Sequence, residues 1–280
     1  DSVLDQTYDD FEIIVVDDGS TDNTEDVVTS YSDDRVKYVF FQGNKGANAA
    51  RNEGIRKSLG KFISFLDSDD EFLPQYIEKS VKTLEQAPKD TVGSFTGYRV
   101  KRGNETVGMS RVNNGEFQLD DLFPGNKIGT FSAVTFKRSV FEHVGYLDED
   151  LDSAQDLDFY IRALKQYNMY SIATPLVNHY VDIDGISNNI YSKISGQKRL
   201  LQKHRNVISN SSLSRIYLNR ANAHSENGHI LKSHQNILRS IRYDPTYWKG
   251  YYYLPFMIMG RRGYYLAEYI KHKFASKLVH

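Results

Sequence analysis

Short apolar runs rich in β-branched and aromatic residues alternate with helix-forming segments over the first 90 residues. The runs are Phe11–Val16, Val36–Phe41 and Lys61–Leu66, and the segments that follow them are 22–31, 46–59 and 74–86. Strand–helix alternation of this kind is typical of a parallel sheet with helices on both faces. The chain is therefore expected to be an α/β protein.

The rest of the chain changes character twice. Strands of a more antiparallel kind are expected at Val92–Lys101, Thr106–Val112 and Thr130–Phe136. A helix is expected at Ser153–Gln166, followed by a strand-like run at Pro175–Tyr180. From about Tyr191 the pattern is typical of helices alone. The sequence thus predicts an α/β part followed by a helical part.

The charges divide the chain at a similar point. Residues 1–190 contain 19 Lys and Arg against 33 Asp and Glu, a balance of −14, whereas residues 191–280 contain 16 against 3, a balance of +13. The formal net charge of −1 conceals this division. Opposite charge balances indicate parts with different tasks. We therefore expect one domain over residues 1–190 and a basic, aromatic-rich helical region over residues 191–280.

Composition excludes several kinds of protein. The 280 residues include no cysteine, which excludes a disulfide scaffold, a thiolate zinc site and a cysteine nucleophile. No apolar run approaches the roughly 20 residues that a membrane-spanning helix needs. The lack of cysteine fits a reducing compartment, and we expect a cytoplasmic protein.

Acidic residues directly follow two of the expected strands. Asp17 and Asp18 end the first, and Asp67 and Asp69 follow the third. Ligands bind at the carboxyl ends of strands in such sheets. Carboxylates one residue apart suit a hard divalent cation such as Mg²⁺ or Mn²⁺. Each pair also has a simpler interpretation, as a solvated turn or as a cluster that caps the next helix.

Three further residues are candidates for chemistry. Arg51 could bind a phosphate through two hydrogen bonds. Asp156, in the first turn of a predicted helix, could act as a general base. His179 could bind a metal ion or a diphosphate. The simpler alternatives are a surface ion pair for Arg51, a carboxylate that complements the helix dipole for Asp156, and a structural histidine for His179.

Three segments carry a family resemblance when taken in order. They are FEIIVVDDGSTDNT, NKGANAARNEGIRKSLGKFISFLDSDDEFLP and FKRSVFEHVGYLDEDLDSAQDLDFYIRAL. Together they resemble the inverting glycosyltransferase family 2, over roughly residues 1–190. The resemblance implies the GT-A fold, a Rossmann-like and mostly parallel sheet with flanking helices. The helical region would follow it.

The resemblance also implies roles for single residues. Asp17 and Asp18 would recognise the nucleotide base, Arg51 and Asn52 would line the nucleotide pocket, Asp67 would lie near the ribose and Asp69 near the metal ion. Asp156 would be the catalytic base. His179 and the following Gly185-Ile186-Ser187 would approach the diphosphate, with His179 as a metal ligand.

Two departures from the family pattern stand out. The base of the family commonly follows a Glu, whereas Gln155 precedes Asp156 here. Family members also begin with a strand and helix, whereas this chain begins at Asp1, near the expected end of that helix. We therefore expect an N-terminally truncated domain whose sheet lacks a central strand and exposes unpaired edges.

The expected reaction is the transfer of a sugar from a nucleotide-diphosphate donor, UDP-sugar by default, to an acceptor hydroxyl. A single displacement assisted by Mn²⁺ or Mg²⁺ would invert the anomeric centre. The acceptor would be a glycan or a lipid-linked molecule in the assembly of cell-surface polysaccharide or glycoconjugate. The alternative is a catalytically inactive nucleotide-sugar-binding fragment, or a binding module without enzymatic activity. A phospho-accepting receiver domain does not explain the segment around Asp156.

The helical region interleaves aromatic and basic residues. Nine aromatic residues lie between Tyr247 and Tyr269, with Arg261, Arg262 and Lys271 among or after them. This composition suits the headgroup zone of an anionic membrane, so a peripheral position on the cytoplasmic face is one expectation. The alternative is that the aromatic residues pack the region internally. Nucleic acid is not expected as a partner, because no recognition motif accompanies the basic residues.

Overall fold

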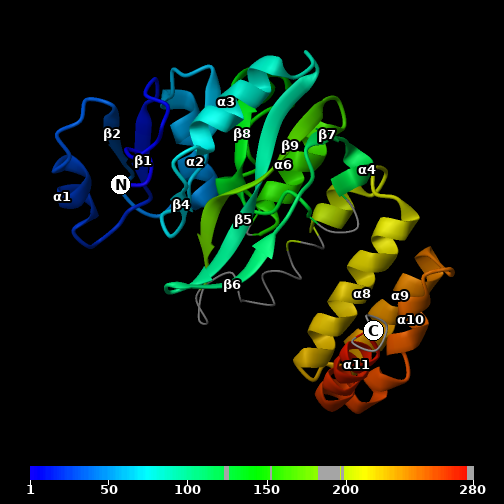
Figure 1. Ribbon diagram of the computed structural model, residues 1–280. Coiled ribbons are helices and arrows are strands. Elements are labelled where there is room, and N and C mark those ends of the chain that lie inside the picture. Colours follow the sequence, from blue (N-terminus) through cyan, green and yellow to red (C-terminus); the bar gives the residue numbers. More distant parts are fainter. Residues whose placement is uncertain (123–125, 152, 182–195, 197–198, 276–280) are drawn as a thin grey trace. The chain divides into compact units, whose positions relative to one another are not determined.

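A computed structural model describes residues 1–122, 126–151, 153–181, 196 and 199–275 (Figure 1). The chain divides into two compact units. The α/β unit comprises residues 1–122 and 126–196, and the helical unit comprises residues 123–125 and 197–280. The boundary expected after residue 190 lies among residues 182–195, outside the described residues, as does Gly185-Ile186-Ser187.

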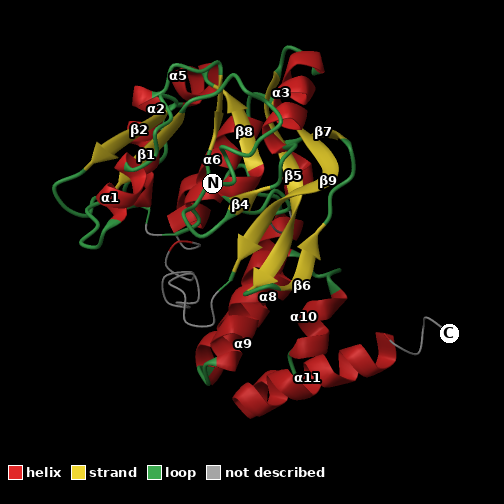
Figure 2. Ribbon diagram, turned by 60° about the vertical axis from the view of Figure 1, so that its left-hand side comes forward, coloured by secondary structure: helices red, strands yellow, loops and turns green. Residues whose placement is uncertain are grey.

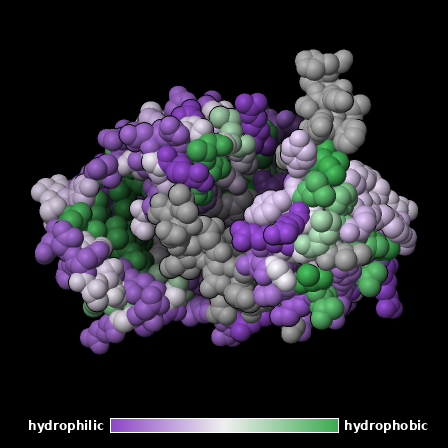
Figure 3. All heavy atoms as spheres, turned by 90° about the horizontal axis from the view of Figure 1, so that it is seen from below, coloured by the Kyte–Doolittle hydropathy of each residue, from purple (hydrophilic) through white to green (hydrophobic). Residues whose placement is uncertain are grey.

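The α/β unit begins with a small parallel sheet. Strand β1 (Ile13–Asp17) pairs with β2 (Val36–Phe40) from Ile13 opposite Val36 to Asp17 opposite Phe40. Helices α1 (Thr24–Thr29) and α2 (Ala47–Lys57) follow these strands. The four apolar residues of β1 stay only half-buried. Figure 3 shows hydrophobic surface on the side of the molecule where β1, β2 and α1 lie.

A second, larger sheet forms the centre of the α/β unit. Its strand order is β3-β8-β5-β9-β4, with β6 paired to β5 and β7 paired to β9. The strands are β3 (Phe62–Ser64), β4 (Glu71–Phe72), β5 (Thr91–Arg102), β6 (Glu105–Ser110), β7 (Gly115–Phe117), β8 (Val134–Lys137) and β9 (Asn168–Tyr180). Among the described residues, no pairing joins this sheet to β1 and β2.

The α/β class is confirmed, but the strand directions differ from a mostly parallel sheet. Only β1–β2 and β5–β9 are parallel, and the other described pairings are antiparallel. The reason is that β5 and β8, which belong to the segments expected to be antiparallel, join the same sheet as β3. Strand β8 pairs with both β3 and β5 in the antiparallel direction.

Helices cover both faces of the larger sheet (Figure 2). Helix α3 (Tyr76–Gln86) lies on one face, and α5 (Ser139–Val144) and α6 (Gln155–Leu164) lie on the other. Short helices α4 (Leu119–Leu122) and η1 (Phe131–Ala133) complete the unit.

The side chains of β8 point alternately to the two faces of the larger sheet and contact helices on both. The hydroxyl of Thr135 donates a hydrogen bond to the hydroxyl of Tyr76 on α3 at 3.3 Å. The next residue, Phe136, packs edge-to-face on Phe159 of α6 with ring centroids 5.1 Å apart. Successive residues of a strand point to opposite faces, so β8 joins both layers. Helix α6 is held firmly by this aromatic packing, which matters because it carries Asp156.

The described part of the helical unit begins with helical residues 199–204, followed by an antiparallel helix pair and three further helices. The elements after residue 204 are α8 (Asn210–Glu226), α9 (Ile230–Tyr243), α10 (Trp248–Tyr253), η3 (Phe256–Met259) and α11 (Gly260–Ala275). Buried serines let α8 and α9 approach closely, and the hydroxyls of Ser214 and Ser240 lie 3.0 Å apart. No helix within the described ranges is both long and apolar enough to cross a membrane.

Candidate active site

Asp17 ends β1 and is almost wholly buried. Its Oδ1 accepts a hydrogen bond from the Ser20 amide at 2.7 Å, and its Oδ2 accepts one from the hydroxyl of Tyr38 at 2.6 Å. These donors, Tyr38 foremost, lower the pKa of Asp17. Asp17 therefore stays ionised and fixes the turn that follows β1.

Asp18 faces the start of α2. Its two oxygens accept hydrogen bonds from the amides of Lys45, at 2.6 Å, and Gly46, at 2.8 Å. These amides belong to the N-cap residue Gly46 and the residue before it, so Asp18 fixes the segment that enters the helix. The turn comes very close to the segment before α2, because a Cβ on Gly19, whose φ is +86°, would lie 2.8 Å from the carbonyl carbon of Gly43. Only glycine permits that approach.

The buried face of α2 is partly polar. Asn48 and Asn52 are buried beside Ala49 and Ile55. Both amides of these asparagines donate to backbone carbonyls of the 147–149 loop, Asn48 to Asp148 at 2.6 Å and Asn52 to Leu147 at 3.0 Å. The two buried asparagines are explained by this loop, whose backbone requires hydrogen-bond partners.

Asn52 is thus a positioning residue in this structure. Its Nδ2 also donates to Glu149 at 2.7 Å, and its Oδ1 accepts from the Leu147 amide at 3.0 Å. The side chain is 1% exposed. Because these protein partners occupy its polar atoms, Asn52 can shape a pocket more readily than it can bind a ligand directly.

Arg51 connects several candidate residues. Its Nη2 donates to Asp67 at 2.6 Å, and its Nη1 lies 3.5 Å from Oε1 of Gln155. The guanidinium carbon lies 5.0 Å from the centre of the Phe131 ring. Arg51 also acts electrostatically on Asp156. The arginine therefore brings Asp67, Gln155 and Asp156 to one place.

The start of α6 holds Asp156 in a constrained conformation. Ala154, just before the helix, has a φ of +58°, and it is the one described non-glycine residue with a positive φ. Such backbone is strained and is often found at functional sites. Nδ2 of Asn126 donates to Oδ2 of Asp156 at 2.7 Å. The helix start and Asn126 together fix where this carboxyl points.

The protein around Asp156 changes its acidity. Burial raises the pKa of Asp156 to about 6, although Arg51 and Asn126 act in the opposite direction. The residue keeps partial contact with solvent. A carboxyl that titrates close to neutral pH and remains reachable can accept a proton in a reaction.

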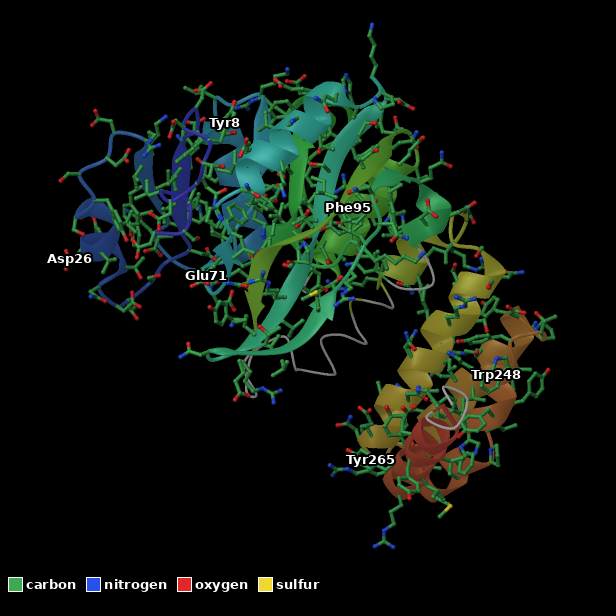
Figure 4. The ribbon with its side chains drawn as sticks, in the orientation of Figure 1. Tyr8, Asp26, Glu71, Phe95, Trp248 and Tyr265 are labelled. Atoms are coloured by element: carbon green, nitrogen blue, oxygen red, sulfur yellow. The ribbon has the colours of Figure 1, made fainter. Side chains whose placement is uncertain are left out.

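Asp70 and His179 form a pair that sequence reasoning identified only in part. Nδ1 of His179 lies 2.9 Å from Oδ1 of Asp70, and the Tyr180 amide donates to the same oxygen at 3.1 Å. Pairing of β4 with β9, with Glu71 opposite Asn178, brings them together across 109 positions. Glu71 marks this strand in Figure 4. Asp70, as the acceptor of the hydrogen bond from the ring of His179, raises the pKa of His179.

Asp69 is exposed beside this pair. Apart from its own amide, no described residue donates a hydrogen bond to its carboxylate. Desolvation, together with the charges of Asp70 and Asp67, raises the pKa of Asp69, while His179 lowers it. Asp69 therefore belongs to the same electrostatic group as Asp67, Asp70 and His179.

Two tyrosines lie within electrostatic reach of several of these residues. The phenol of Tyr98 is influenced by both Asp156 and Asp70, and the phenol of Tyr160 by Asp156, Arg51 and Asp67. Arg51, Asp67, Asp69, Asp156 and His179 are thus neighbours in the structure. Asp17 and Asp18 contact the turn after β1, β2 and the start of α2.

Comparison with known proteins identifies the family. The model described as "Glycosyl transferase family 2" matches residues 1–145, more than half of the chain. The chain belongs to glycosyltransferase family 2. A family relative, TuaG of Bacillus subtilis (strain 168), whose name connects it with teichuronic acid biosynthesis, is 30% identical over 193 residues, which cover 67% of this chain and 74% of TuaG. Several other curated relatives are longer, and the chain spans between 17% and 60% of their length.

Solved structures of glycosyltransferases show the GT-A fold of this family 2 chain. S. aureus TarS 1–349 in complex with UDP-GlcNAc has a TM-score of 0.69 at 17% identity, over 97% of this chain and 86% of that one. The mannosyltransferase PcManGT from Pyrobaculum calidifontis, in complex with GDP-Man and Mn²⁺, has a TM-score of 0.56 at 17% identity, over 86% and 68%. At these identities the likeness shows the fold alone.

The residues around Asp69 fit a divalent metal ion of the kind that GT-A enzymes commonly use. Among the described residues, the carboxylate of Asp69 has no partner besides its own amide, and Asp70 holds Nδ1 of His179, so that Nε2 is left for a ligand. No described group of three or more His, Cys, Asp or Glu residues could hold a metal ion by itself. Two protein ligands suit Mg²⁺ or Mn²⁺, which take their remaining ligands from phosphate and water.

Proposed function

We propose that this family 2 chain transfers a sugar from a nucleoside diphosphate to an acceptor hydroxyl, with inversion at the anomeric carbon. The observation that carries the proposal is Asp156, a carboxyl with a pKa of about 6 in electrostatic contact with Arg51. Arg51 in turn binds Asp67 at 2.6 Å. A base next to a cation that can bind phosphate supports group transfer from a diphosphate.

A UDP-sugar is the proposed donor. The TarS structure contains UDP-GlcNAc and the PcManGT structure contains GDP-Man, so the fold accepts more than one base. In this proposal the turn of Asp17 and Asp18 faces the base and Asp67 lies near the ribose. Asn52 supports the pocket wall from behind through its hydrogen bonds to the 147–149 loop.

Asp69 and His179 are the proposed ligands of Mn²⁺ or Mg²⁺. When bound, such an ion neutralises the diphosphate and stabilises it as a leaving group. Asp70 contributes by fixing the ring of His179 through Nδ1, which keeps the lone pair of Nε2 directed outward.

In the proposed reaction Asp156 takes the proton of the acceptor hydroxyl. The acceptor oxygen forms a bond to the anomeric carbon on the face opposite the diphosphate. The bond from that carbon to the diphosphate breaks at the same time, and its electron pair leaves with the nucleoside diphosphate. A single displacement inverts the configuration and requires no covalent intermediate with the enzyme.

Nucleotide release tests this proposal. The chain is incubated with a panel of UDP- and GDP-sugars, Mn²⁺ and glycan acceptors, and free nucleoside diphosphate is measured. We expect Asp156→Asn to lower turnover by about 10²- to 10⁴-fold without weakening UDP binding, because a general base contributes on this scale. Asp120→Asn, which neutralises an exposed carboxylate on α4, is the matched control and should keep full turnover.

A nucleotide-sugar-binding module without catalysis is the second candidate function. Gln155 favours it, because a neutral amide stands at the position of the family's acid and its Nε2 donates to the Leu151 carbonyl at 2.6 Å. UDP binding by calorimetry without release from any donor would support this candidate and contradict the transfer proposal.

A glycan or lipid-linked molecule of cell-surface polysaccharide assembly is the proposed acceptor class. The name of TuaG supports it. A peripheral position on the cytoplasmic face of the membrane is proposed on a separate observation. Aromatic residues on α10 and α11 remain well exposed, with Trp248 at 61%, Tyr251 at 50%, Tyr265 at 53% and Tyr269 at 63%.

Basic residues accompany these aromatic side chains. Arg261 and Arg262 are exposed at the start of α11, and the guanidinium carbon of Arg261 lies 5.8 Å from the ring centre of Tyr265. Figure 4 labels Trp248 and Tyr265 at the margin of the helical unit, and Figure 3 shows green side chains broken by purple ones along that unit. Flotation with phosphatidylcholine vesicles, with and without phosphatidylglycerol, tests the position. Binding to neither contradicts it.

A further inference from the structure

Two arginines of the helical unit share one tyrosine ring. The guanidinium carbons of Arg220 on α8 and Arg239 on α9 lie 5.5 Å and 5.7 Å from the ring centre of Tyr217. Tyr217 stacks on Tyr243 of α9, with ring centroids 5.3 Å apart and planes inclined by 9°. A third guanidinium, that of Arg205, lies 5.1 Å from the Tyr243 ring. Three cations therefore gather around one stacked pair of rings.

Arg220 is buried without a partner for its charge. It is 9% exposed, and its Nε is buried without a hydrogen bond. Neither a hydrogen bond nor an ion pair joins its guanidinium to any residue that the structure describes. Burial, together with the nearby charge of Arg239, lowers the pKa of Arg220. A buried N–H without an acceptor costs free energy, of which the tyrosine ring recovers only a part.

The acidic side chains of the helical unit interact with residues other than Arg220 and Arg239. Residues 191–280 contain three acidic side chains, Glu226, Asp244 and Glu268. Glu268 pairs with Lys271 at 2.9 Å, Asp244 accepts from the hydroxyl of Thr246 at 2.6 Å, and Glu226 acts on the phenol of Tyr264. Because each is engaged elsewhere, none of the three pairs with Arg220 or Arg239 in the described part of the unit, and the two guanidiniums can accept an anionic ligand.

We propose that Arg220 and Arg239, with Tyr217 as the wall between α8 and α9, form a binding site for the phosphate group of a phosphate ester. This site goes beyond the transfer reaction and uses none of its residues. A phosphate carries up to two negative charges and three or more acceptor oxygens, so a single group can neutralise both guanidiniums. Planar guanidinium groups bind phosphate through paired hydrogen bonds. The ester can belong to a soluble glycan phosphate or to a lipid headgroup, and the experiment separates these sources.

Binding of inorganic tripolyphosphate tests the site directly. Calorimetry on the full chain in EDTA compares the wild type with Arg239→Gln, which alters an exposed side chain and should leave the fold intact. Arg242→Gln is the matched control, because Arg242 is equally exposed three positions further along α9. We expect Arg239→Gln to weaken binding about tenfold, the loss typical of one hydrogen bond to a charged group. The control should change it less than about twofold, and UDP affinity should stay the same in both variants.

The Nε–H signal of Arg220 gives a second measurement that needs no mutation of the buried residue in the titrated sample. Its ¹⁵N-correlated peak, assigned by its absence in Arg220→Gln, should shift on titration with tripolyphosphate. If soluble phosphate has no effect but phosphatidylglycerol vesicles bind with the same dependence on Arg239, the site holds and a lipid headgroup is its source. Equal losses in Arg239→Gln and Arg242→Gln, or no dependence on Arg239 with either probe, would overturn the proposal.

Discussion

The carboxyl of Asp156 is subject to opposing influences. The protein around it raises its pKa, while Arg51 and the amide of Asn126 lower it, and the result is a pKa of about 6. Only the ionised form can accept a proton from a hydroxyl. The fraction of active enzyme should therefore depend on pH just below neutrality, unlike that of an ordinary surface aspartate with a pKa near 3.8.

The pH dependence of kcat/KM is the first prediction. We expect the value to rise tenfold per pH unit below about pH 6 and to level off above it, because Asp156 ionises over that interval. Ionisation of Asp156 also lowers the free energy of unfolding as pH rises from 3.8 towards about 6. The reason is that the folded state binds the proton of this carboxyl more tightly than the unfolded state does. Initial rates measured at several pH values give the profile. A flat profile between about pH 5 and pH 7 would contradict the assignment.

Asp70 acts through His179 and not on the substrate. Its side chain is fully buried and lies 2.9 Å from Nδ1 of the histidine. Partners of this kind orient a metal-binding histidine. Its carboxylate also accepts from the Tyr180 amide, so it joins the end of β9 to β4.

Replacement of Asp70 is the second prediction. Asp70→Asn keeps the shape but removes the charge, and we expect the affinity for Mn²⁺ in the presence of UDP to fall about 10- to 100-fold. Electron paramagnetic resonance of free Mn²⁺ measures it. Glu85→Gln, which removes an exposed negative charge from α3, is the control. Unchanged Mn²⁺ affinity in Asp70→Asn would contradict the role of His179 as a metal ligand that Asp70 orients.

At the scale of elements, α2 and the 147–149 loop behave as one structure. Asn48 and Asn52, one turn apart, bind the backbone of that loop, and the loop leads into α6 with Asp156. Amide side chains therefore connect the helix that carries Arg51 to the loop that leads into the helix that carries Asp156.

Loss of this connection is the third prediction. Asn52→Ala leaves the amide and the carbonyl of Leu147 without their partners. We expect the free energy of unfolding to fall by about 3 kcal/mol, since buried groups that lose hydrogen bonds cost about 1–3 kcal/mol each. Urea denaturation measures the change. Asn44→Ala, at an exposed position before α2, should change it by less than about 0.5 kcal/mol. A similarly small effect of Asn52→Ala would show that the loop does not depend on α2.

Sequence reasoning located most elements within a few residues. Strands β1 and β2 and helix α3 match the expected ranges closely, because apolar runs and a preceding Pro74 mark them clearly. Elements of two to six residues, such as β4 and α5, carry too few residues for a periodic pattern and were not anticipated.

In the candidate site, too, some residues could be predicted from the sequence and others could not. Asp67, Asp69, Asp156 and His179 stand out through their positions after strands or in a helix start, and the structure brings them close together. Asn126 could not be found, since it lies in a loop and contacts Asp156 across 30 positions. Asp70 was passed over although it is the third carboxylate of its cluster, because its partnership depends on the pairing of the two-residue strand β4.

At the scale of the whole molecule, charge and chemistry separate between the units. Every residue proposed for the donor site, from Asp17 to His179, belongs to the α/β unit, in the part of the chain with a balance of −14. The exposed aromatic residues and the Arg220–Arg239 cluster belong to the helical unit, in the part with a balance of +13. Each unit also has hydrophobic clusters of its own, around Tyr76 in the first and Leu218 in the second.

This separation leads to the last prediction, which concerns a chain that ends at residue 196. Its UDP affinity should stay within about twofold of the full chain, because every residue proposed for the donor site belongs to the α/β unit. Binding to phosphatidylglycerol vesicles should be lost, because the remaining part carries an excess of negative charge and is repelled by an anionic surface. Calorimetry and flotation on the two chains measure these properties, and circular dichroism confirms that the shorter chain is folded. If a folded shorter chain lost UDP binding, the helical unit would have to contribute to the donor site; if it still floated with the vesicles, the membrane surface would have to be sought on the α/β unit.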